Sequence, residues 1–131
     1  MPAAFPNPTG GELAILRVLW LRKEPMTVRQ VHEVLSRSKA TAYTTVLKML
    51  TIMAGKGLVR RDDSERSHTY RAAHAEPVVQ AWLLKDLVRR AFSGSALTLV
   101  QRAIDDEITS PHDLQTIADL IARAKAKRKK D

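Results

Sequence analysis

The sequence predicts a mainly α-helical fold that contains one small β-hairpin. Apolar residues recur at helical spacings of three and four over most of the 131-residue chain. Two capping boxes mark helix starts near the N-terminus, and one segment near the middle alternates β-forming and polar residues. The length allows one compact domain, or a small domain with an appended dimerisation module.

Charge is distributed unevenly along the chain. The formal net charge of +8 consists of +6 in residues 1–74, −3 in residues 75–122 and +5 in residues 123–131. A basic surplus of this size favours a polyanionic partner, with nucleic acid first and an anionic membrane surface second. The acidic middle part indicates a second module with a different task.

The chain begins with an arm and a helix. Residues 1–8 contain three prolines and no periodicity, which predicts a flexible arm. Thr9 and Glu12 form a capping box, so a helix is expected over residues 10–22. Its apolar positions are Leu13, Leu16, Leu19 and Trp20.

A second, shorter helix follows Pro25. Thr27 and Gln30 form another capping box at its start. Its apolar face consists of Val28, Val31 and Leu35. The polar composition of residues 36–40 predicts a turn after it.

A third helix is expected from about Thr41 to Gly55 or Gly57, where a glycine can end it with a positive φ. Its apolar face is Val46, Met49, Leu50 and Met53. Its outer face is Thr44, Lys48 and Thr51. One face suits packing on a domain, and the other suits a DNA groove.

A hairpin is expected next. Residues 58–61 form a short strand, residues 62–65 have turn composition, and residues 67–71 alternate as a returning strand should. Three helices followed by a basic hairpin is the chain order of a winged helix-turn-helix.

The sequence from Ala75 onward predicts helices only. Residues 76–93 are apolar on more than one face, so this helix is expected to be buried on most sides. Ser110, Pro111 and Asp113 provide the start signals of the last helix, whose basic end over residues 123–130 is expected to fray. An amphipathic stretch between the two carries Leu97, Val100, Ile104 and Ile108.

The predicted organisation is therefore an arm over residues 1–8, an N-terminal winged helix-turn-helix domain over residues 9–74, and a C-terminal helical dimerisation domain with a basic tail over residues 75–128. Excess apolar faces on short helices favour a homodimer, and the alternative is that they fold back as a monomeric core. The expected dimerisation residues are Trp82, Leu83, Leu87, Phe92, Leu97, Val100, Ile104, Leu114, Ile117 and Ile121.

Double-stranded DNA is the expected partner of the third helix and the hairpin. Threonine and lysine side chains can contact base edges in the major groove, and arginines on an adjacent ribbon can contact flanking phosphates. The expected contact residues are Thr41, Tyr43, Thr44, Thr45, Lys48, Thr51, Arg60, Arg61, Arg66, Ser67 and His68. The alternative is a solvated helix face beside a charged strand edge.

Enzymatic function is not expected. The four histidines, His32, His68, His74 and His112, are scattered without metal-ligand spacing and suit surface or hydrogen-bonding roles. The sequence contains no P-loop, nucleophile elbow or paired-carboxylate motif, so no catalytic residue, metal site or cofactor is expected. The absence of cysteine excludes disulfides and thiolate zinc sites.

No apolar run approaches a membrane span and residues 1–9 lack signal-peptide character, so a cytoplasmic protein without membrane insertion is expected. The leading interpretation is a sequence-specific repressor. A winged-helix adaptor for an acidic protein partner is one alternative, and a small-molecule-responsive transcriptional regulator is another.

Six stretches together suggest a family. They are ELAILRVLW at residues 12–20, TVRQV at 27–31, AYTTVL at 42–47, KGLVRR at 56–61, YRA at 70–72 and AFSGS at 91–95. Over nearly its whole length the chain resembles the penicillinase-repressor (BlaI/MecI/CopY) family. The resemblance implies a homodimer that represses promoters at palindromic operators, including those of β-lactamase-type or stress genes.

The resemblance also implies roles for particular residues. It places Thr44, Thr45 and Lys48 on the recognition helix, and it implies a membrane sensor protease that relieves repression by cleavage. Two positions depart from the family pattern: Ile52 stands where many members carry arginine, and Arg102–Ala103 stands roughly where some relatives are cleaved.

Overall fold

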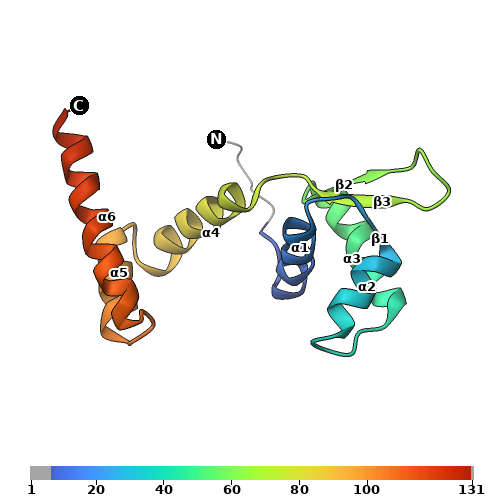
Figure 1. Ribbon diagram of the computed structural model, residues 1–131, viewed down its shortest axis with the longest axis horizontal. Coiled ribbons are helices and arrows are strands. Elements are labelled where there is room, and N and C mark those ends of the chain that lie inside the picture. The colour runs from blue at the N-terminus through green and yellow to red at the C-terminus, as the bar shows by residue number, and fades with distance from the viewer. Residues whose placement is uncertain (1–6, 131) are drawn as a thin grey trace. The chain divides into compact units, whose positions relative to one another are not determined.

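The computed structural model describes residues 7–130, which form six helices and three short strands (Figure 1). The chain divides into two compact units between Leu83 and Leu84. The first unit contains the helix-and-hairpin arrangement predicted from the sequence, and the division falls inside the fourth helix. Apart from its last two residues, the predicted N-terminal arm lies outside the described residues.

Helix α1 (Gly10–Arg22) and helix α2 (Val28–Ser36) begin at the predicted capping boxes. The hydroxyl of Thr9 accepts from the Glu12 amide at 3.2 Å, and the Glu12 carboxylate accepts from the Thr9 amide at 2.9 Å. Thr27 and Gln30 repeat this pair of bonds at the start of α2 with the same two distances. Both starts are therefore fixed by local side chains.

Helix α3 (Tyr43–Lys56) begins two residues later than the sequence predicted. Ala42 occupies its N-cap position in an extended conformation and provides no side-chain cap. Thr41 lies before the helix, in the turn that follows α2. The predicted end is confirmed, because Gly57 adopts φ +81 and terminates α3 in the left-handed region that favours glycine.

The sheet has three antiparallel strands in the order β1-β3-β2, one more than the sequence predicted. Strands β2 (Val59–Asp62) and β3 (Thr69–Ala72) form the expected hairpin. Strand β1 (Met26–Thr27) lies between α1 and α2 and pairs with β3. Two residues are too few to show alternation, so this strand escaped prediction.

The core of the first unit joins α1, α2, α3 and the sheet. On α3, Val46, Leu50 and Met53 are fully buried, while Met49 is half-buried against the same cluster. The predicted apolar face of α3 is therefore confirmed. The other buried members are Ile15, Leu16, Leu19, Met26, Val28, Val31, Leu58, Val59 and Tyr70.

One ion pair ties the start of α1 to the end of α3. The Nζ of Lys56 donates to both carboxylate oxygens of Glu12, at 2.9 and 3.0 Å, and Glu12 is only 4% exposed. Burial raises the pKa of Glu12, but hydrogen bonds from Lys56 and Thr9 outweigh it, so the pKa lies below its ordinary value. The two residues are 44 positions apart in sequence.

Three helices complete the chain: α4 (Glu76–Ala91), α5 (Ala96–Asp105) and α6 (Pro111–Lys130). Within residues 84–129, no side chain is buried. Burial of α4 on most sides was expected but is wrong for a single chain, because Val79 is its one buried residue.

Two further expectations for the second unit are wrong. Ile108 lies outside α5 and is 76% exposed, because Glu107 enters the left-handed region at φ 58 and ends the pattern. Residues 123–130 continue α6 rather than fray. Alanine, lysine and arginine, which make up most of this segment, are strong helix formers.

Candidate nucleic-acid interface

Helix α3 presents a continuous exposed face on the side opposite the core. Thr44, Lys48 and Thr51 lie on this face, as predicted, and all three are exposed. Leu47 lies among them and is 41% exposed, although the sequence analysis did not select it. Leu47 lies three residues after Thr44 and four before Thr51, and this helical spacing could have placed it on the same face. No acidic residue occurs on α3, so nothing on this helix would repel a polyanion.

The turn before α3 is held by side chains of α2. The Nε2 of His32 lies 2.7 Å from the carbonyl oxygen of Thr41, and the His32 and Tyr43 rings meet edge to face at 5.8 Å. The hydroxyl of Thr41 donates to the Lys39 carbonyl at 2.9 Å. His32 therefore has the hydrogen-bonding role predicted for it, and it positions Tyr43 at the first turn of α3.

The threonines of α3 differ in the hydrogen-bonding capacity that they leave free. Thr51 donates its hydroxyl hydrogen to the Leu47 carbonyl at 2.8 Å, so it offers a methyl group and acceptor lone pairs. Among the described residues, Thr44, Thr45 and Lys48 have no side-chain hydrogen bond or ion pair. These three can donate outward from α3, and Tyr43, which is 44% exposed, adds a phenolic hydroxyl at its first turn.

The hairpin places two arginines directly opposite each other. Arg60 on β2 pairs in register with Arg71 on β3, and both side chains are exposed. Facing like charges destabilise an antiparallel pair, and no carboxylate in the described chain lies within ion-pair distance of either arginine. An anion between them would remove this repulsion.

Other polar groups of the hairpin are engaged with one another. Asp63 accepts from Nε and Nη2 of Arg61 at 2.8 and 3.1 Å, and the Nδ1 of His68 lies 3.3 Å from its Oδ1. The hydrogen bond from Arg61 to Asp63 raises the pKa of Arg61. Arg66 and Ser67 are exposed in the connecting loop. Arg61 and His68 are therefore both paired with Asp63. Arg60 and Arg66 have no ion-pair partner among the described residues.

Asp62 stabilises the turn that begins the loop. Its carboxylate accepts from the Ser64 amide at 2.9 Å. The pKa of Asp62 is lowered first by this backbone hydrogen bond and also by attraction to Arg71. The ionised Asp62 carboxylate therefore stabilises the turn at Ser64, where the loop leaves β2.

Both tryptophans meet at His74, just after the hairpin. The Nε1 of Trp20 donates to the His74 carbonyl at 2.9 Å, and the Trp82 ring meets the His74 ring edge to face at 4.9 Å. Trp82 and Leu83 were expected in the dimerisation set, and the structure places both in the first unit.

The other residues expected at a dimer interface lie in the second unit, and none of them is buried. Phe92 and Ile117 are half-buried. The exposed members are Leu87, Leu97, Val100, Ile104, Leu114 and Ile121.

Residues 7–130 offer neither a metal site nor a membrane-spanning helix. No group of three or more histidine, aspartate or glutamate side chains is placed to hold a metal ion in this part of the chain. None of the helices over the same residues has both the length and the apolar character needed to cross a membrane.

Residues 8–123 match the family described as penicillinase repressor. The transcriptional regulator BlaI of Mycobacterium tuberculosis, from strains CDC 1551 / Oshkosh and ATCC 25618 / H37Rv, is 42% identical over 80 residues, or 61% of this chain. That match spans 58% of the length of these relatives.

A solved structure is also similar to part of the chain. The solution structure of the DNA-binding domain of the repressor BlaI aligns with a TM-score of 0.49 at 22% identity. The alignment covers 56% of this chain and 88% of that domain.

Proposed function

The chain belongs to the penicillinase repressor family, a family of transcriptional repressors rather than enzymes, and we propose that it represses transcription as a homodimer on a palindromic DNA operator. The observation that carries the proposal is the acid-free exposed face of α3 beside the opposed Arg60 and Arg71. Together they supply base-reading donors and phosphate-binding charge on one compact unit.

The recognition helix of this proposal is α3. Thr44, Thr45 and Lys48 have free donors for base edges or phosphates, and the side chain of Leu47 can contact a thymine methyl group. Arg60 and Arg71 would bind a phosphate of the flanking backbone, which relieves their mutual repulsion. Arg66, in the loop that connects β2 and β3, adds a third positive charge to the hairpin.

The homodimer is supported by the surface of the second unit. A unit without a buried side chain gains little hydrophobic stabilisation as a single chain, and a second copy can cover its apolar side chains. A two-fold dimer carries two recognition helices and therefore reads two half-sites.

Lys48 is the position that tests whether α3 recognises the base sequence of DNA. Lys48→Ala is expected to weaken binding to a duplex selected by the wild-type protein by about 1–3 kcal/mol, because it removes a donor to a base edge. Fluorescence anisotropy at fixed salt measures the loss. Lys85→Ala removes the same charge from α4 and should bind as wild type does. A wild-type chain that selects no duplex even at low salt would disprove the proposed function.

Arg60 and Arg71 test phosphate binding by the wing. The Arg60→Ala and Arg71→Ala double variant is expected to lower the slope of log affinity against log salt by about 1 per half-site, since the two arginines share one phosphate and each neutralised phosphate contributes about 1. The loss should be similar for specific and random duplexes. Arg89→Ala with Arg102→Ala is the matched control, and an unchanged slope in the wing variant would contradict phosphate binding there.

The family resemblance extends the proposal to regulation. We propose that the regulated genes are of the β-lactamase or stress type, and that a membrane sensor protease relieves repression in the cytoplasm. Deleting the gene should raise transcripts beside its operator. Immunoblotting after exposure to a β-lactam would show whether the chain is cleaved, and an intact chain throughout induction would contradict proteolytic release.

A further inference from the structure

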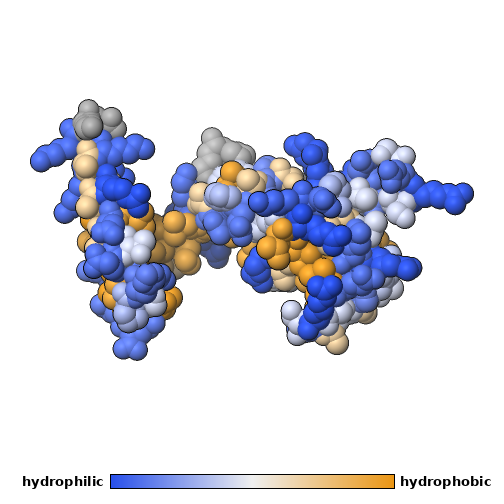
Figure 2. All heavy atoms as spheres, viewed as in Figure 1, coloured by the Kyte–Doolittle hydropathy of each residue, from blue (hydrophilic) through white to orange (hydrophobic). Residues whose placement is uncertain are grey.

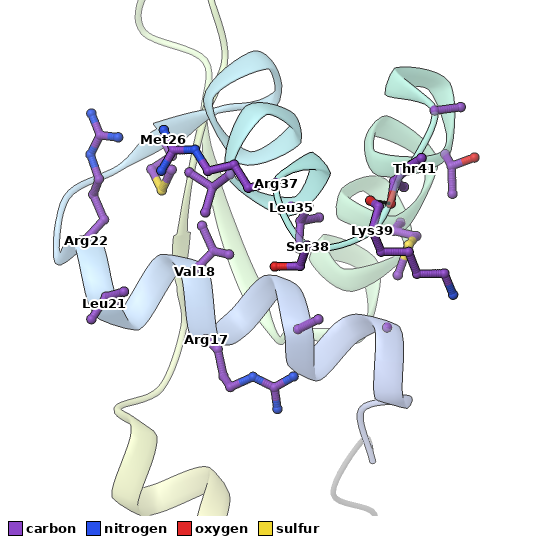
Figure 3. Close-up of a pocket in the computed structure, with 17 residues that line it drawn as sticks. Arg17, Val18, Leu21, Arg22, Met26, Leu35, Arg37, Ser38, Lys39 and Thr41 are labelled. Carbon is purple, nitrogen blue, oxygen red and sulfur yellow. Dashed lines mark hydrogen bonds between the residues drawn. The ribbon is translucent and has the colours of Figure 1, made fainter.

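A groove of about 910 Å³ lies between α1, α2 and the start of α3, wholly inside the first unit. Its walls are largely apolar, and Figure 2 shows apolar residues gathered between α1 and α2 with hydrophilic residues around them. Val18 of α1 and Leu35 of α2 both line it (Figure 3). Leu21 on its rim is 85% exposed, so this apolar surface is uncovered in the described chain.

The rim of the groove is cationic. Four basic residues line it and no carboxylate does, and none of the four has an ion-pair partner among the described residues. They are Arg17, Arg22, Arg37 and Lys39. In Figure 3, Arg37 extends along the groove toward Met26, and Arg22 stands at that same end. Two guanidinium groups therefore lie at one end of the apolar groove.

From this combination we propose that the groove binds an amphipathic organic anion, with an acidic group held by Arg22 and Arg37 and an apolar body along Val18 and Leu35. Arginine pairs carboxylate, sulfonate or phosphate oxygens with two parallel hydrogen bonds. The volume falls within the range of about 300–1,000 Å³ that is usual for small-molecule sites. The apolar wall gives hydrophobic binding energy that inorganic phosphate could not use.

The ligand would also act on DNA binding, and this part of the inference rests on the proposed function. Thr41, Ala42 and Thr45 form part of the groove wall. Thr41 and Ala42 precede α3, and Thr45 in its first turn is itself one of the donors that we assign to DNA. A ligand that shifts this turn changes the position of those donors, so occupied and empty grooves should differ in DNA affinity.

The test uses naphthalene-2-sulfonate as the probe and the full chain carrying ¹³C-methyl-labelled methionine. Met26, although fully buried, and the half-buried Met49 line the groove, whereas the fully buried Met53 does not. Saturable shifts of the Met26 and Met49 methyl signals are expected, with a smaller shift of the Met53 signal. Arg22→Gln with Arg37→Gln should raise the dissociation constant at least about 10-fold, the effect of losing charge-assisted hydrogen bonds.

Two controls make the result specific. Arg123→Gln with Arg128→Gln removes the same charge from α6 and should leave the dissociation constant unchanged. The neutral probe 2-naphthalenemethanol should bind at least about 10-fold more weakly than the sulfonate, because it lacks the ionised partner for arginine. Unaltered thermal unfolding of each variant confirms that it is folded.

Three outcomes would overturn the site: no shift at Met26 and Met49, equal binding of the neutral probe, or unchanged affinity in the Arg22 and Arg37 variant. The DNA part is measured separately, as duplex affinity with and without saturating probe. Equal affinities overturn the coupling alone. A chain that binds the probe but no duplex overturns the proposed function and leaves the anion site standing.

Discussion

Replacing Ile104 and Ile121 by lysine is expected to weaken binding to a two-half-site duplex by about 10²–10⁴-fold, the usual contribution of linking two binding modules. Both side chains are exposed apolar residues, on α5 and α6. A lysine at either position costs little in a single chain but would be desolvated in a dimer interface. The variant should therefore sediment as a monomer and bind a single half-site as wild type does.

The matched control introduces the same charges at polar positions. Gln101→Lys on α5 and Gln115→Lys on α6 are exposed substitutions that should leave both sedimentation and affinity unchanged. A dimer that survives in the Ile104 and Ile121 variant would place the interface elsewhere. A wild-type chain that sediments as a monomer at micromolar concentration and binds both half-sites independently would contradict the homodimer itself.

Glu12→Gln is expected to lower the free energy of unfolding at pH 7 by about 1–3 kcal/mol, because the variant leaves the ammonium of Lys56 without its buried anionic partner. Denaturant unfolding followed by circular dichroism measures the loss. Glu33→Gln on α2 removes an exposed carboxylate and should have a much smaller effect. Equal stability of the wild type and the Glu12 variant would show that the ion pair does not stabilise the fold.

The same ion pair gives the protein an acid-sensitive contribution to stability. The pKa of Glu12 in the folded chain lies below its ordinary value of 4.5. The ionised carboxylate therefore stabilises the fold fully above that ordinary value, and the stabilisation is lost as the pH falls through the folded pKa. The difference between wild type and Glu12→Gln should shrink over this acidic range. A difference that stays constant on acidification would contradict the assignment.

Features set by neighbouring residues could be predicted from the sequence. Thr9 with Glu12 fixed the start of α1, and Gly57 fixed the end of α3, because capping depends on side chains within one helical turn. The apolar face of α3 followed from its periodicity. The expectation that its other face enters a DNA groove came from the same periodicity, and the family resemblance agreed with it.

Features that depend on distant pairing could not be predicted. The partnership of Glu12 with Lys56 requires α1 and α3 to be packed, and the opposition of Arg60 and Arg71 requires the register of the hairpin. Strand β1 exists because Met26 pairs with Tyr70, and the residues on either side of Met26 show no strand pattern. The groove has the same origin, because its walls come from separate helices.

The meeting of Trp20 and Trp82 at His74 provides the protein with its own fluorescent reporter. These are the two tryptophans of the chain, and both lie in the first unit. Intrinsic emission will therefore follow the joint between α1 and the start of α4, while a far-ultraviolet signal follows the helices of both units. A thermal scan recorded at both wavelengths can reveal whether the two units melt together or in separate steps, without any label.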